Sequence, residues 1–182
     1  TDSTTLSVGY EYQESHTADP TWGGLPTWYS DGSKTNYNRS QTVAPDWAYS
    51  DKDSTRIFAN LTQRFDNGWE AHINGMHAET NFDSKLMYMS GYPDKETGAG
   101  LVGYGGWNRG ERKQDAVDAF LRGGFDLFGR QHEMMFGGSF SRQRNHYDNT
   151  MPDAVYGMVD VGNFKNWNGN IADPQWTPWK LY

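Results

Sequence analysis

Apolar and polar residues alternate over five long stretches of the chain. From Thr4 to Glu14 the even positions hold Leu6, Val8, Tyr10 and Tyr12, and the odd positions are polar or glycine. Successive side chains of a β-strand point to opposite faces, so a period of two predicts strands with one apolar and one polar face. The pattern recurs at residues 55–65, 69–82, 114–127 and 132–147, with Phe58 as an exception. The chain is therefore predicted to be all-β.

The length of these stretches separates two kinds of β-protein. Strands of soluble proteins usually have about 5–6 residues, and every stretch is longer than that. A tilted strand that crosses a bilayer needs about 9–11 residues. Long strands with a thin apolar face and a polar opposite face are typical of outer-membrane β-barrels. The alternative is a soluble β-sandwich, in which the apolar faces of two sheets pack against each other.

Short and long connections alternate between the predicted strands. Asp66-Asn67-Gly68 is a strong hairpin signal, and residues 128–131 form a second short turn. Long segments occupy residues 15–54, 83–113 and 148–182. Such loops are unusual in compact soluble domains, whereas bacterial barrels have short turns on one side and long outward-facing loops on the other. We therefore expect about five strands of a transmembrane antiparallel barrel with long extracellular loops.

Composition excludes several other classes of protein. The chain has no Cys, which excludes a disulfide scaffold and thiolate metal sites. Its net charge of -7 argues against a nucleic-acid partner. No His motif or isolated carboxylate pair points to catalysis or to metal binding. We therefore expect no enzyme, no protein-bound metal and no cofactor.

Aromatic residues in the long segments are the candidates for ligand contact. They are accompanied by Gly, Asn, Ser and Asp, and together these residue types provide rigid contact area and hydrogen bonds. The alternative is that the aromatic residues pack on one another as a small core of the loops themselves. The first two segments supply the five candidate ligand-binding residues, which are Trp28, Tyr29, Trp22, Tyr104 and Trp107. Tyr88, Trp176 and Trp179 lie in these long segments as well.

Five strands cannot close a barrel, because even the smallest barrels have about eight. An open sheet edge in lipid would leave backbone groups without hydrogen bonds. We therefore expect the sequence to be a piece of a longer chain.

Several segments resemble the TonB-dependent siderophore receptors of the outer membrane. The closest resemblance is to the ferric coprogen and rhodotorulic acid receptors, which take hydroxamate siderophores. The segments that carry it are Gly24–Ser33, Pro45–Lys52, Leu127–His132, and Gly169-Asn170 followed by Trp176-Thr177-Pro178.

The resemblance implies a 22-stranded barrel with an N-terminal plug, located in the outer membrane of a Gram-negative bacterium. Residues 1–182 would form the N-terminal part of that barrel, without the plug and the remaining strands. The partners implied are a ferric hydroxamate siderophore, the TonB–ExbB–ExbD complex acting through the plug, and outer-membrane lipid with lipopolysaccharide. Iron would be held by the oxygen donors of the siderophore. Trp28 best matches the ligand-contacting aromatic position of the family.

Two alternatives to a siderophore receptor are compatible with the sequence. One is a TonB-dependent receptor of the same architecture for another ligand, such as a peptide, heme or a sugar. The other is a soluble β-sandwich that binds carbohydrate by aromatic stacking.

Overall fold

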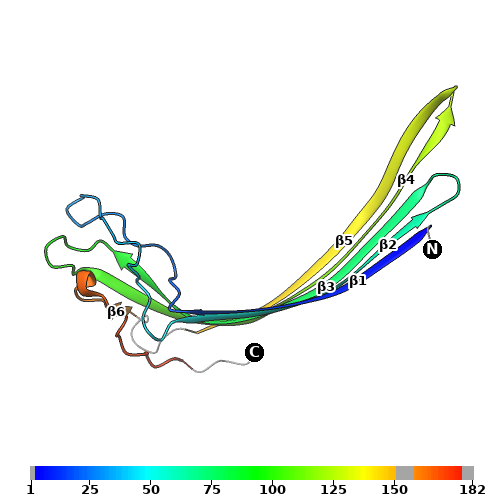
Figure 1. Cartoon of the computed structure of the whole chain (residues 1–182). Coiled ribbons are helices and arrows are strands. Elements are labelled where there is room, and N and C mark those ends of the chain that lie inside the picture. The colour runs from blue at the N-terminus through cyan, green and yellow to red at the C-terminus, as the bar shows by residue number, and fades with distance from the viewer. Residues whose placement is uncertain (1–2, 151–157, 178–182) are drawn as a thin grey trace. The chain divides into compact units, whose positions relative to one another are not determined.

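A computed structural model describes residues 3–150 and 158–177 and shows one antiparallel sheet. Its five long strands are neighbours in chain order, β1-β2-β3-β4-β5 (Figure 1). Their bounds are β1 (Thr4–Ala18), β2 (Tyr49–Arg64), β3 (Glu70–Gly91), β4 (Leu101–Leu127) and β5 (Arg130–Thr150). The predicted all-β fold with five long strands is therefore confirmed. A two-sheet sandwich is not present in the described residues.

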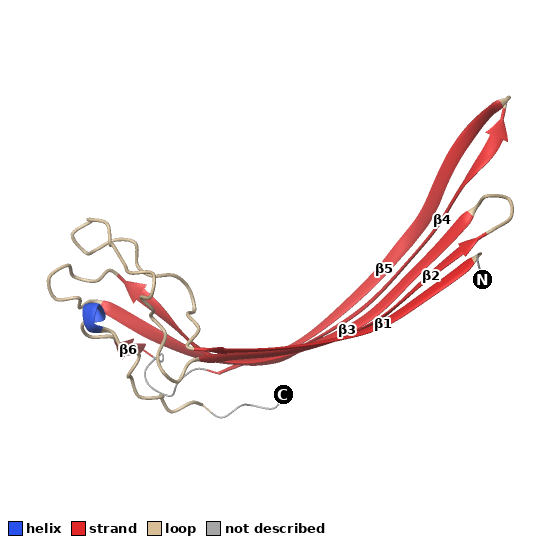
Figure 2. Ribbon diagram, viewed as in Figure 1, coloured by secondary structure: helices blue, strands red, loops and turns tan. Residues whose placement is uncertain are grey.

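Two short elements were not expected from the sequence (Figure 2). Strand β6 (Met158–Asp160) pairs antiparallel with the start of β4, with Val102 opposite Asp160. A single turn of 3-10 helix, η2 (Phe164–Asn166), follows it. Within residues 3–150 and 158–177, no helix is long and apolar enough to cross a membrane.

The strands are longer than the alternation predicts, and the expected loop at residues 83–113 is wrong. β3 continues to Gly91 and β4 begins at Leu101, so only residues 92–100 connect them. The apolar alternation stops near residue 82 although the hydrogen-bonded ladder continues. Alternation of apolar and polar residues arises where one face of a strand lies in an apolar environment and the other in a polar one. It is lost where the two faces no longer differ in this way.

The chain divides into two compact units, which are described separately. The strand unit contains Thr1–Glu14, Asp53–Asn81 and Glu111–His146. The loop unit contains Ser15–Lys52, Phe82–Gly110 and Tyr147–Tyr182.

The strand unit exposes its apolar side chains. Leu6, Ile57 and Phe136 are 64%, 49% and 56% exposed. Polar partners pair across the strands, as where Arg122 Nε donates to Glu70 Oε2 at 2.8 Å. A sheet with an unburied apolar face and a paired polar face is the arrangement expected for a wall between lipid and water. It is not the interior of a soluble globule.

Glycines in the strand unit make room for aromatic rings on the neighbouring strand. A Cβ added at Gly9 would lie 2.2 Å from Phe58, and one added at Gly123 would lie 2.3 Å from Trp69. Phe58 therefore covers Gly9 on the otherwise polar face, with the Arg56 guanidinium 5.1 Å from its ring centroid. Aromatic rings that cover strand glycines restore packing that glycine lacks. This explains why Phe58 breaks the alternation.

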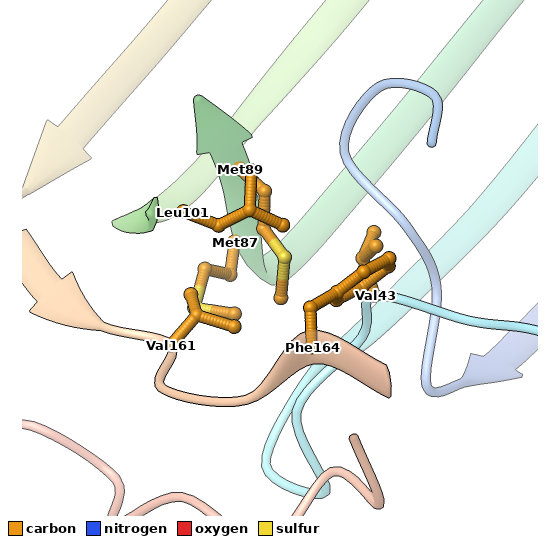
Figure 3. Packing of buried hydrophobic residues seen from close by; sticks show 6 residues of the cluster. All are labelled: Val43, Met87, Met89, Leu101, Val161 and Phe164. Atoms are coloured by element: carbon orange, nitrogen blue, oxygen red, sulfur yellow. The ribbon is translucent and has the colours of Figure 1, made fainter. Parts of the chain in front are cut away.

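The loop unit has a buried core (Figure 3). Six apolar side chains from β3, β4, the first long connection and the C-terminal segment point toward one another: Val43, Met87, Met89, Leu101, Val161 and Phe164. Leu25, Tyr37, Trp47 and Trp167 pack against them. The expectation that some loop aromatics form a small core is therefore confirmed. That core holds the connection of residues 19–48, which carries three of the five candidate residues.

Candidate ligand-binding surface

Trp28 lies at the base of a tight turn in the first long connection. It forms an isolated antiparallel bridge with Lys34, and Tyr29 N donates to Ser33 O at 2.8 Å. Asp31 Oδ1 accepts from Ser33 N at 2.8 Å and from Ser33 Oγ at 2.6 Å. These hydrogen bonds hold the pKa of the Asp31 carboxyl below its usual value. The turn therefore fixes the backbone that presents the Trp28 indole.

A cavity of about 530 Å³ opens beside the indole of Trp28. Its lining is mostly apolar or uncharged: Leu25, Pro26, Thr27, Trp28, Lys34, Thr35 and Tyr37. Lys34 is the single charged residue in this lining, and its Nζ lies 5.6 Å from the centroid of the Trp28 ring. Trp28 remains 42% exposed. An apolar hollow with one or two polar groups is typical of small-molecule sites.

Tyr29 lines a second cavity, of about 290 Å³, together with Tyr37 and Lys165. Tyr37 contributes to the lining of both cavities and meets Phe164 edge-on, with ring centroids 5.7 Å apart. Burial raises the pKa of the Tyr37 phenol, so it stays neutral. Through Tyr37 the turn is tied to the loop core, which makes the Trp28 cavity part of a packed structure.

Trp22 covers a glycine of β4. A Cβ added at Gly106 would lie 2.7 Å from the Trp22 ring, and one added at Gly23 would lie 3.0 Å from Tyr88. Both aromatic side chains stay partly exposed, Trp22 by 41% and Tyr88 by 45%. They form an aromatic surface over the β3–β4 hairpin.

Trp107 belongs to a different cluster. Its Nε1 donates to Asp83 Oδ1 at 2.8 Å, and its ring centroid lies 6.1 Å from that of Trp176. Lys85 Nζ lies 5.0 Å from the Trp107 centroid and 2.9 Å from Asp173 Oδ2. The Trp107 indole is therefore engaged in contacts within the protein. Its position next to Gly106 on β4 places it on the opposite face of the strand from Trp22.

The structure thus separates the five predicted residues. Trp28 and Tyr29 share one turn, and Trp22 covers β4. The expectation that Tyr104 and Trp107 lie in a loop is wrong, because both lie on β4 and Tyr104 is half-buried opposite Met158 of β6. Trp179 and Pro178 lie outside the described residues. Across residues 3–150 and 158–177, no group of three or more His, Asp or Glu is placed to hold a metal ion.

Sequence reasoning missed Lys34. It stands six positions after Trp28, and the intervening Asp31-Gly32 pair, with Gly32 at φ 79°, is a turn signal. That signal would have placed the two side chains on adjacent arms of a hairpin.

Comparisons of the sequence and of the fold with known proteins find the same group of receptors. No family model matches the chain. The chain is 36% identical over 181 residues to the ferric-pyoverdine BN7/BN8 receptor of Pseudomonas putida, covering 95% of this chain and 22% of that receptor. Along nearly its whole length the chain is similar to a ferric-pyoverdine receptor. It is also 31% identical over 184 residues to the ferripyoverdine receptor of Pseudomonas aeruginosa, covering 95% of this chain and 21% of the receptor. The chain therefore spans about a fifth of the length of these relatives.

Solved structures agree with the sequence relatives. The ferripyoverdine receptor of the Pseudomonas aeruginosa outer membrane, bound to ferripyoverdine, matches with a TM-score of 0.81 at 26% identity. That match covers all of this chain and 24% of the receptor. A complex of the receptor with pyocin S2 matches with a TM-score of 0.77 at 27% identity, covering 96% of this chain and 23% of that one.

The fold is that of a segment of a TonB-dependent receptor barrel, as predicted. The outer-membrane location predicted from the alternation is the location of the relatives. The relatives are receptors, in line with the absence of catalytic motifs. The finer resemblance to coprogen-type hydroxamate receptors is not confirmed, because the relatives are named for pyoverdines.

Proposed function

We propose that the chain is part of an outer-membrane receptor that takes up a ferric siderophore in a TonB-dependent manner. The match along nearly the whole chain to receptors named for ferric pyoverdine supports this most strongly. Pyoverdines are the first class of ligand to test. Coprogen-type hydroxamates are the second, because segments such as Gly24–Ser33 resemble their receptors.

The architecture of the whole protein is part of the same proposal. Residues 1–182 would form the N-terminal part of a 22-stranded barrel whose plug and remaining strands lie elsewhere in the full protein. Transport would draw energy from TonB–ExbB–ExbD through that plug. The exposed apolar face of the strand unit, with Leu6 and Phe136, would contact outer-membrane lipid and lipopolysaccharide.

Trp28 is the proposed centre of ligand binding. Its indole is partly exposed, is positioned by hydrogen bonds in the turn, and borders a mostly apolar cavity. Tyr29 and Trp22 are supporting candidates in the same connection. Tyr104 and Trp107 are weaker candidates, since the indole of Trp107 is held by Asp83 and Lys85.

The test uses the full-length receptor in iron-starved cells that are given one ferric siderophore at a time. Uptake is measured with ferric pyoverdine and with ferric coprogen. Trp28→Ala removes one aromatic contact, so we expect affinity for the transported ligand to fall about tenfold while expression is unchanged. Phe128→Ala is the control, because Phe128 is a fully exposed aromatic residue in the short turn between β4 and β5. Absence of uptake of every ferric siderophore by the unmodified receptor would contradict the proposal. Unchanged affinity in Trp28→Ala would remove only Trp28 from the site.

A further inference from the structure

Residues 161–176, which we call the strap, link two parts of the loop unit. At its start, Phe164 N donates to Gly98 O at 3.0 Å, which attaches the strap to the connection between β3 and β4. The Phe164 ring points toward Val43 of the first long connection, inside the shared core (Figure 3). Further along, the strap contains the Gly169-Asn170 pair, one of the segments that resemble siderophore receptors.

Gly169 lies where the strap meets the first long connection. Asp46 N donates to Gly169 O at 2.9 Å, and two positions earlier Trp167 Nε1 donates to Ala44 O at 3.1 Å. Because Ala44 is buried, loss of the indole donor would leave its carbonyl without this hydrogen bond, which is costly. Gly169 has a φ of 81°, and a Cβ added there would lie 2.2 Å from Asp46 Oδ1. Glycine is therefore required for this close approach.

The Trp28 turn, residues 27–35, belongs to the connection that the strap holds. Tyr37, two residues after the turn, packs against the strap and lines the Trp28 cavity. Ser30 N donates to Pro93 O at 3.0 Å, so the turn is also attached to the β3–β4 connection. A loop that is ordered before a ligand arrives loses less conformational entropy on binding, which raises affinity. The strap is placed to order the first long connection in this way.

We propose that the strap positions the Trp28 turn for the ligand, with Gly169 and Trp167 as positioning residues that do not touch the ligand. This inference rests on the proposed function of the receptor. A turn that adopts the binding orientation only part of the time lowers the apparent affinity by that fraction. A loosened strap should therefore weaken binding while the number of binding sites per receptor stays the same.

Gly169→Ala is the test substitution, because the new Cβ would collide with the Asp46 carboxylate. Gly162→Ala is the matched control. Gly162 lies in the same strap at a φ of 66°, and a Cβ added there would have no atom within 4 Å. Both substitutions carry the strain of a left-handed backbone, so the collision is the difference between them. Asp46→Ala combined with Gly169→Ala removes the colliding carboxylate and should restore binding.

A milder variant, Trp167→Phe, keeps a ring in the core and removes the donor to Ala44. All variants are made in the purified full-length receptor. Titration with ferric pyoverdine and with ferric coprogen gives the dissociation constant and the number of sites. Hydrogen exchange of residues 27–35 without ligand reports the order of the Trp28 turn directly.

We expect Gly169→Ala to speed exchange in the Trp28 turn and to weaken binding of the ferric siderophore about five- to tenfold at an unchanged number of sites. Trp167→Phe should weaken binding about threefold, and Gly162→Ala less than about twofold. The double variant should return to within about twofold of the unmodified receptor.

Three outcomes would overturn the role of the strap. These are unchanged exchange in both Gly169→Ala and Trp167→Phe, faster exchange with unchanged affinity, and a loss of sites without a change in affinity. Failure of the unmodified receptor to bind either ferric siderophore would instead count against the proposed function. The exchange data would then still decide whether the strap orders the turn.

Discussion

The strand unit and the loop unit use the same strands in opposite ways. In the strand unit, large apolar side chains such as Val8 and Phe140 are more than half exposed. In the loop unit, Met87 and Leu101 are fully buried, and every residue of the described core lies there. β3 and β4 pass from one unit into the other without interruption. The difference shows that the burial of an apolar side chain on these strands depends on what packs against the strand, and not on the strand backbone.

The two units therefore predict different responses to the same kind of substitution. A buried methionine or leucine in the loop unit is held by neighbouring protein atoms. An exposed leucine or phenylalanine in the strand unit is held by hydrocarbon, if the proposed function is correct. Each of the substitutions below is made in the full-length receptor.

Leu101→Ala should destabilise the loop unit by about 2–5 kcal/mol, because it leaves a cavity among Met87, Met89 and Phe164. The measurement is the free energy of unfolding in chemical denaturant. Leu6→Ala is the matched control and should cost much less, since Leu6 has no protein core around it. Similar losses for the two variants would remove the distinction between the units.

Phe136→Arg should lower the stability of the membrane-inserted protein by about 2–4 kcal/mol, because a charge on the lipid-facing side of a barrel is costly. Ser139→Arg on the same strand is the control, because alternation places Ser139 on the polar face. Unfolding from lipid vesicles gives both values. Should Ser139→Arg prove the more harmful of the two, the assignment of the faces would be reversed.

Gly9→Ala should destabilise the strand unit by about 1–3 kcal/mol, because the new Cβ would lie 2.2 Å from the Phe58 ring and would displace it. In a Phe58→Ala background the cost should largely disappear, which a double-mutant cycle measures. Gly138→Ala has open space around it and should be close to neutral. Equal costs at Gly9 with and without Phe58 would show that the ring does not depend on this glycine.

The connection between β3 and β4 should loosen in acid before the strands do. Hydrogen bonds to Asp94 Oδ1 from Thr97 N at 2.7 Å, Thr97 Oγ1 at 2.9 Å and Glu96 N at 2.9 Å hold the pKa of this carboxyl below its ordinary value of 3.8. The contribution is fully present above that value and is lost as the pH falls through the lowered pKa. Hydrogen exchange of residues 94–99, corrected for intrinsic rates, should show the step.

Asp94→Asn provides the control for that measurement. The amide still accepts hydrogen bonds but does not titrate, so the acid-dependent step should vanish. A step of equal size in this variant would assign the titration to another group.

Alternation predicted the fold wherever one face meets an apolar surrounding. Ile57 and Leu61 in β2, and Met134 and Phe136 in β5, mark their strands clearly. Residues 101–110 show no apolar alternation. Gly103 and Gly106 in this stretch leave room for the side chains of Met87 and Trp22, which are remote in sequence. A local pattern cannot report a partner on another segment, so the extended ends of β3 and β4 could not be predicted.

The same limit applies to the candidate site. Trp28 and Tyr29 were identified by residue type and by resemblance, and the structure places both on one turn. Trp107 was also identified by residue type, but its indole donates a hydrogen bond to Asp83 and contacts Trp176. The surroundings of the Trp107 indole depend on Lys85 and on Trp176 in the C-terminal segment. No motif in the sequence predicts these contacts.

The uninterrupted course of β4 from Leu101 to Leu127 limits how this gene can change in length. Deleting one codon in the middle of β4 would move every later side chain of the strand to the opposite face of the sheet. An arginine would then take the position of a leucine. Deleting two codons would preserve the assignment. Viable insertions and deletions within the strand should therefore come in even numbers.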